Sequence, residues 1–132
     1  MTKPFIPEPG AAIVRYLVAD LDRAIAFYTR SLDFHVVAQA GPVATIARGQ
    51  LHLLLSGTAA SGARPMPDGA QQAPGGWNRI VLYVDNLDAA IATLEKTKAH
   101  FRNAVESGPG GRQILLDDPD GNPTELHEAP KR

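Results

Sequence analysis

Hydrophobic residues in the first half of the chain change their period twice, which predicts one strand, one helix and three further strands. Residues 11–18 (AAIVRYLV) form a short run rich in β-branched side chains, as in a strand. From Leu21 to Leu32, apolar residues recur at steps of three and four, which predicts an amphipathic helix capped by Asp20. The three strands that follow are predicted at residues 34–40, 43–47 and 51–55.

The same order of periods returns after a long segment that has no period. Residues 56–78 are rich in Gly, Ala, Pro and Ser, and they predict a connection that acts as a linker or a lid. The pattern then restarts with a strand at residues 79–84, a cap at Asn86 and a helix from Leu87 to about Thr97. Three more strands are predicted at residues 101–105, 112–117 and 123–128.

An internal comparison supports a duplication of one βαβββ unit. A shift of 66 residues aligns the two strand–helix segments and gives six identities among the 17 positions from Ile13 to Thr29. Two amphipathic helices share some identities by chance. The evidence for a duplication therefore also depends on the same order of strands and helix in both halves. We predict a single domain over residues 1–132, with modules at 11–55 and 79–128 joined by residues 56–78.

Composition excludes several classes of function. The 132 residues can form one hydrophobic core, and 13 basic against 14 acidic residues leave a formal charge of -1. This balance provides no basic surface for nucleic acid. The absence of cysteine excludes disulfides and thiolate chemistry, and no apolar run reaches the length of a membrane span. We therefore expect a cytoplasmic protein without nucleic-acid or membrane partners.

Two segments carry a family resemblance. The sequences VADLDRAIAFYTRSLDF (18–34) and DDPDGNPTELHE (117–128) resemble the opening and closing signatures of the vicinal oxygen chelate superfamily, which includes glyoxalases, bleomycin resistance proteins and dioxygenases. The resemblance implies an α+β fold in which two βαβββ modules form a curved, mixed half-barrel sheet with helices outside. It also implies a ligand pocket between the modules and, for a chain this short, a homodimer.

The resemblance further implies metal ligands on the first and fourth strands of each module. Counting back from the two caps places the first-strand positions at Ile13 and Arg79, and the fourth strands place the others at Leu54 and Glu125. Only Glu125 suits a divalent cation, since the aliphatic side chains have no lone pair and arginine is permanently charged. We expect no metal and no other cofactor, and we predict that an Arg79–Glu125 ion pair replaces the cation.

Strand alternation adds candidate ligand-binding residues, because side chains two positions apart lie on the same face of a sheet. Arg79 and Arg15 could hold a carboxylate or phosphate, although either could instead end in water. Tyr83 and Trp77 could stack on a planar ligand, although aromatic residues more often fill cores or seal loops. The position of Trp77, at the end of the long connection, is also compatible with a lid.

Three ionisable residues are candidates for proton transfer. Glu125 could be a general base in a partly apolar pocket, but an arginine beside it would favour a structural or ligand-anchoring role. His52 and His127 could move protons near neutral pH or could be hydrogen-bonded wall residues. Glu125 is the one candidate catalytic residue, and all three are candidate ligand contacts.

Three functions are compatible with these patterns. The first is a metal-independent protein that binds a small organic ligand in the pocket between the modules. The second is a glyoxalase-like or epimerase-like lyase or isomerase that uses Glu125 as acid or base, with or without a metal. The third is a structural domain that pairs with another chain. The sequence leaves open whether the protein is an enzyme.

Overall fold

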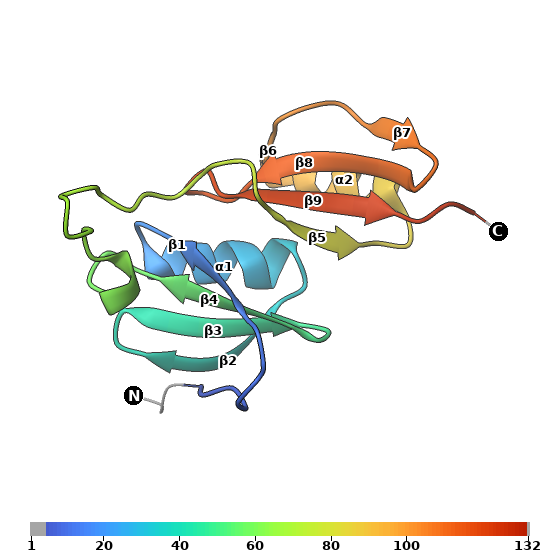
Figure 1. The fold of residues 1–132 in the computed structure, drawn as a ribbon. Coiled ribbons are helices and arrows are strands. Elements are labelled where there is room, and N and C mark those ends of the chain that lie inside the picture. The colour runs from blue at the N-terminus through green and yellow to red at the C-terminus, as the bar shows by residue number, and fades with distance from the viewer. Residues whose placement is uncertain (1–4, 132) are drawn as a thin grey trace. The chain divides into compact units, whose positions relative to one another are not determined.

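A computed structural model describes residues 5–131 and shows the predicted βαβββ order in the first half, and the same order with one strand divided in two in the second half (Figure 1). The chain divides into two compact units between Pro74 and Gly75, inside the connection predicted from the sequence. We call residues up to Pro74 the first unit and residues from Gly75 the second unit. Within the described residues, no helix is long and apolar enough to cross a membrane.

The first unit is a four-stranded mixed sheet with one helix. Strand β1 lies parallel to β4, and β3 pairs antiparallel with both β4 and β2, so the strand order is β1-β4-β3-β2. A single turn of 3-10 helix, η1, follows β4 within the connection. The elements are β1 (Val14–Leu17), α1 (Leu21–Ser31), β2 (His35–Ala40), β3 (Val43–Arg48), β4 (Leu51–Ser56) and η1 (Ser61–Ala63).

The core of the first unit lies between this sheet and α1. Ala24 and Tyr28 on the helix are fully buried, and the Tyr28 ring meets the ring of Phe34 edge to face at 5.4 Å between centroids. On the sheet, Leu53 and Leu55 are fully buried, whereas their neighbours His52 and Leu54 are only partly covered. The predicted alternation of faces is therefore present in this unit.

The second unit repeats the arrangement with a divided edge strand. The strand order is β5-β9-β8-β6, and β7 also pairs with β8. Neither the first sheet nor the second closes into a barrel within the described residues. The elements are β5 (Ile80–Tyr83), α2 (Leu87–Lys96), β6 (His100–Phe101), β7 (Glu106–Gly108), β8 (Gly111–Asp117) and β9 (Pro123–Glu128).

Both predicted helix caps are confirmed. The Asp20 carboxylate accepts a hydrogen bond from the backbone N–H of Arg23 at 3.0 Å, and the Asn86 side chain accepts one from Ala89 N–H at 3.0 Å. At the start of α2, the backbone N–H of Leu87 donates to the buried carboxylate of Glu128 at 2.9 Å. This hydrogen bond connects the first residue of α2 to the last residue of β9.

The prediction of one continuous strand at residues 101–105 is wrong. The ladder with β8 is interrupted because the side-chain oxygen of Asn103 accepts the hydrogen bond of Leu115 N–H at 2.9 Å. The backbone N–H of Arg102 still donates to the Leu115 carbonyl at 2.9 Å. A side-chain amide thus replaces one backbone partner, and the chain leaves β6 before it returns as β7.

Thr124 offers a test of packing in the second unit. Its side chain is fully buried, and its hydroxyl oxygen has no hydrogen-bond partner among residues 5–131. We expect Thr124→Val to raise the free energy of unfolding by about 1 kcal/mol, because valine fills the same volume without an unpaired hydroxyl. Urea unfolding would measure the change. Thr93→Val, on the exposed side of α2, should stay within about 0.5 kcal/mol of the wild type, and a less stable Thr124→Val would contradict the argument.

Candidate functional site

The candidate site lies on the face of the second sheet that α2 does not cover. Strand register places Val81 level with Glu125 and Tyr83 level with His127, so these four side chains belong to one face. Val81 and Tyr83 are 44% and 60% exposed, whereas Ile80 and Leu82 on the other face are buried. The open face therefore combines exposed apolar surface with two ionisable residues of β9.

The predicted ion pair between Arg79 and Glu125 is present on this face. The Nε and Nη2 atoms of Arg79 donate to the same carboxylate oxygen, Oε1, at 3.0 and 2.9 Å. The Nη1 atom donates to the backbone carbonyl of Trp77 at 3.3 Å. The Glu125 side chain is only 8% exposed, so its charge depends on these partners.

His127 holds the other oxygen of the same carboxylate. Its Nδ1 lies 2.8 Å from Glu125 Oε2, and its Nε2 lies 2.8 Å from the backbone carbonyl of Gly110. Both partners are acceptors, so the two bonds form together only when both ring nitrogens carry protons. The hydrogen bond to Glu125 and then that to Gly110 raise the pKa of His127 above its ordinary value. The centroids of the Tyr83 ring and the His127 imidazole are 4.9 Å apart.

The Arg79–Glu125–His127 cluster keeps the carboxylate ionised. Burial alone raises the pKa of Glu125, but hydrogen bonds from His127 and Arg79 lower it further than burial raises it. The net shift is downward, which makes Glu125 a weaker base than an isolated glutamate. The catalytic role predicted for Glu125 stays a prediction, and the geometry favours an anchoring role.

The residues at the four expected metal-ligand positions do not fit a divalent cation. Arg79 brings a positive charge to one position, and both oxygens of Glu125 are already bonded to cationic groups. In the first unit Ile13 lies two residues before Arg15, the register partner of Leu54, just as Arg79 lies two residues before Val81, the register partner of Glu125. Neither Ile13 nor Leu54 has a lone pair that could bind a cation. Among the described residues, no group of three or more His, Asp or Glu side chains is arranged to hold a metal ion.

The two candidates of the first unit have partners of their own. Arg15 Nη1 donates to the hydroxyl of Ser56 at 3.0 Å, and its guanidinium lies where a Cβ atom at Gly62 would collide with it. Arg15 thus lies against η1 in a space that only glycine leaves open. His52 is stacked under the ring of Phe5, with 4.7 Å between centroids and 7° between planes. Ligand contacts by Arg15 and His52 stay predictions.

Trp77 is held by a residue that the sequence analysis did not single out. Its side chain is 72% exposed, and the guanidinium carbon of Arg102 lies 4.7 Å from the ring centroid. Arg102 also donates to Asp117 at 2.6 Å and to the carbonyls of Gly76 and Gly121 at 2.8 and 3.0 Å. No sequence motif marks Arg102, because its partners come from three separate segments.

The match to a protein family covers most of the chain. Residues 11–126 match the family described as the Glyoxalase/Bleomycin resistance protein/Dioxygenase superfamily. The chain belongs to this superfamily. The comparison with curated proteins finds no match. The resemblance and the α+β fold class predicted from the sequence are both confirmed.

Solved structures of the superfamily share the fold over nearly the whole chain. A superfamily member from Sphaerobacter thermophilus DSM 20745 is 29% identical, with a TM-score of 0.70 over 89% of this chain and 97% of that one. Lactoylglutathione lyase from Agrobacterium tumefaciens is 24% identical, with a TM-score of 0.65 over 92% and 96%. TnmS3, an antibiotic binding protein from Streptomyces sp. CB03234, is 24% identical, with a TM-score of 0.68 over 94% and 100%. At 24% identity the likeness concerns the fold alone.

The two pKa shifts predict how His127 contributes to stability at different pH. His127 has a raised pKa, so its contribution is complete below its ordinary pKa of 6.5 and is lost as the pH rises through the folded-state pKa. Glu125 has a lowered pKa, so its contribution is complete above its ordinary pKa of 4.5 and is lost as the pH falls through the folded-state pKa. The pair should contribute most between these two values.

We therefore expect His127→Gln to destabilise the protein more at about pH 5.5 than at about pH 9. Urea unfolding of both proteins at each pH measures the difference in free energy of unfolding. His35→Gln, on exposed β2 of the first unit, is the matched control and should show no comparable dependence. An equal loss at both pH values for His127→Gln would contradict the charged state assigned to the imidazole.

Proposed function

We propose that this superfamily member is a metal-independent binding protein for small organic molecules, with the open face of the second sheet as the ligand surface. The observation that carries the proposal is the Arg79–Glu125–His127 cluster, in which cationic groups hold both carboxylate oxygens. A cation at that place would have to displace both partners. The fold suits such a role, since one structure of this fold is that of an antibiotic binding protein.

The chemistry of this face favours a planar ligand with an anionic group. With His127 protonated, two positive charges surround a single carboxylate, so the cluster carries a net positive charge. Of the five N–H donors of Arg79, three serve Glu125 and the Trp77 carbonyl. The exposed ring of Tyr83, beside His127, supplies an aromatic surface for stacking.

The alternative of a lyase or isomerase requires Glu125 to accept or donate a proton. The lowered pKa of Glu125 works against that role, because a carboxylate that is held ionised by two cations is a weak base. Turnover of a lactoylglutathione precursor that a chelator abolishes would favour the enzyme over the binding protein. The homodimer and the cytoplasmic location expected from the sequence remain proposals.

Metal binding tests the first part of the proposal. After incubation with Ni²⁺ and desalting, we expect the wild-type protein to retain no stoichiometric metal. Arg79→His should retain about one equivalent, because it would place a second imidazole beside Glu125 and His127 without the competing charge. Arg79→Ala is the matched control, since it removes the charge without adding a ligand. Stoichiometric Ni²⁺ in the wild-type protein would contradict metal independence.

Ligand binding tests the second part. We expect 1-naphthoate to quench or shift signals from Tyr83 in a saturable titration, and we expect uncharged 1-naphthamide to bind more weakly there. Arg79→Met should weaken 1-naphthoate binding by about tenfold, as expected for the loss of one charge-assisted contact. Arg30→Met, on the exposed last turn of α1, is the control for loss of one positive charge. Equal binding by the wild type and Arg79→Met would rule out the proposed anchor.

A further inference from the structure

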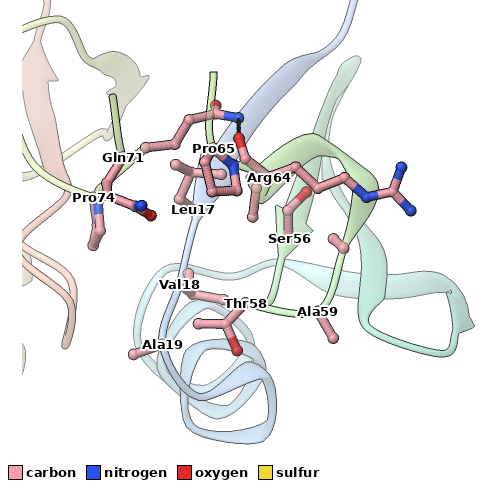
Figure 2. A pocket seen from close by; sticks show the side chains of 13 residues that line it. Leu17, Val18, Ala19, Ser56, Thr58, Ala59, Arg64, Pro65, Gln71 and Pro74 are labelled. Atoms are coloured by element: carbon pink, nitrogen blue, oxygen red, sulfur yellow. Dashed lines mark hydrogen bonds between the residues drawn. The ribbon is translucent and has the colours of Figure 1, made fainter. Parts of the chain in front are cut away.

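The first unit contains a cavity that the cluster in the second unit does not involve. Its volume is about 310 Å³, and it lies where β1 and β4 end, under the connection that follows β4 (Figure 2). A volume of this size is at the lower end of the range for small-molecule sites, about 300 to 1,000 Å³. Its lining includes Leu17, Val18, Thr58, Ala63, Arg64 and Gln71.

Contacts within the first unit keep the connection in place over this cavity. The Gly57 N–H donates to the Pro42 carbonyl at 2.8 Å, where the connection leaves β4. Further along, the Gln72 side-chain amide donates to the Arg64 carbonyl at 2.8 Å. Arg15, which lies against Gly62, also bonds Ser56 at the end of β4. The wall of the cavity is therefore formed by the protein's own hydrogen bonds and does not need a ligand to assemble it.

Apart from Arg64, the residues that line the cavity carry no charge. Arg64 is its one ionisable residue, and Figure 2 shows the Arg64 guanidinium pointing away from Leu17 and Gln71. Leu17 and Val18 give apolar surface at the end of β1, and Pro65 and Pro74 add to it from the connection. A charged ligand that loses part of its hydration beside Leu17 and Gln71 gains no counter-charge from either residue, which is unfavourable.

Two polar side chains of the lining remain available to a ligand. Among residues 5–131, the hydroxyl of Thr58 and the amide of Gln71 make no hydrogen bond to another side chain or to the backbone. A glutamine amide offers a donor and an acceptor side by side, so it pairs best with a ligand group that presents the same two functions in reverse. Carboxamides and lactams have this arrangement.

We propose that this cavity is a binding site for a small uncharged molecule that carries a carboxamide or a similar paired donor and acceptor. The apolar part of the molecule lies against Leu17, Val18 and the two prolines, and its amide pairs with Gln71. The residues of this site all belong to the first unit, and those of the proposed ligand surface belong to the second unit. Evidence against one proposal therefore leaves the other untouched.

Three molecules of the same size and shape test the proposal on the full chain: benzamide (neutral), benzoate (negative) and benzamidine (positive). Amide chemical shifts in ¹⁵N-labelled protein report where each molecule binds. We expect benzamide to give saturable shifts at Leu17, Ser56 and Ala60, with a Kd of about 10 mM or lower for a molecule of nine heavy atoms. Binding of the two charged molecules at these residues should be weaker by at least about tenfold.

Two variants of the lining and one control variant locate the site. Ala63→Leu places a larger side chain in the lining and should abolish the benzamide shifts, whereas Ala92→Leu, on the exposed side of α2, should leave them unchanged. Gln71→Glu adds a negative charge to the lining and should reverse the order, so that benzamidine binds more tightly than benzamide. Dispersed spectra of the variants show that they are folded.

Several results would overturn the proposal. These are the absence of saturable benzamide shifts around the cavity, equal affinity there for all three molecules, or unchanged benzamide binding by folded Ala63→Leu. Benzoate shifts confined to Tyr83 and its neighbours, together with benzamide shifts at the cavity, would support two separate sites with opposite charge preference.

Discussion

The carboxylate of Glu125 is buried, and it stays ionised there because two cationic groups hold it. An unpaired buried charge costs several kcal/mol, roughly, so the positions of Arg79 and His127 are constraints on the whole second unit. Arg79 fixes the start of β5 against β9, and it also bonds the carbonyl of Trp77. His127 extends the same network to Gly110, between β7 and β8. Through these two partners, the Glu125 side chain is connected to the carbonyl of Trp77 before β5 and to the carbonyl of Gly110 between β7 and β8.

Much of the fold follows from local sequence, and the exceptions have long-range causes. The caps at Asp20 and Asn86 and the two helices were predictable because each depends on residues within one or two turns. The break after β6 was not predictable, because the side chain of Asn103 bonds the backbone of Leu115 in β8, 12 residues later. The Gly/Pro-rich connection has no period, so the sequence did not predict that residues up to Pro74 belong to the first unit.

The same distinction applies to the candidate site. The ligand positions implied by the superfamily resemblance, together with alternation along the first and last strands of the second module, predicted that Arg79 and Glu125 meet. The bond between His127 and the Gly110 carbonyl could not be predicted in this way, because Gly110 lies in a turn 17 residues earlier in the chain. Arg15 beside Gly62, and Trp77 beside Arg102, depend on how irregular segments fold back onto strands. The cavity of the first unit depends on the same folding back, and no pattern in residues 56–78 predicts it.

The contact between His127 and Gly110 connects proton uptake to the backbone of the second unit. A neutral imidazole has one N–H, so it can donate to Glu125 or to the Gly110 carbonyl but not to both. Loss of one proton therefore forces a choice between the buried carboxylate and the hairpin that joins β7 to β8. Because a charged carboxylate is the stronger acceptor, the bond to the Gly110 carbonyl is the one that we expect to be lost. The pH therefore determines whether the His127 side chain bonds the backbone between β7 and β8 as well as the carboxylate of Glu125.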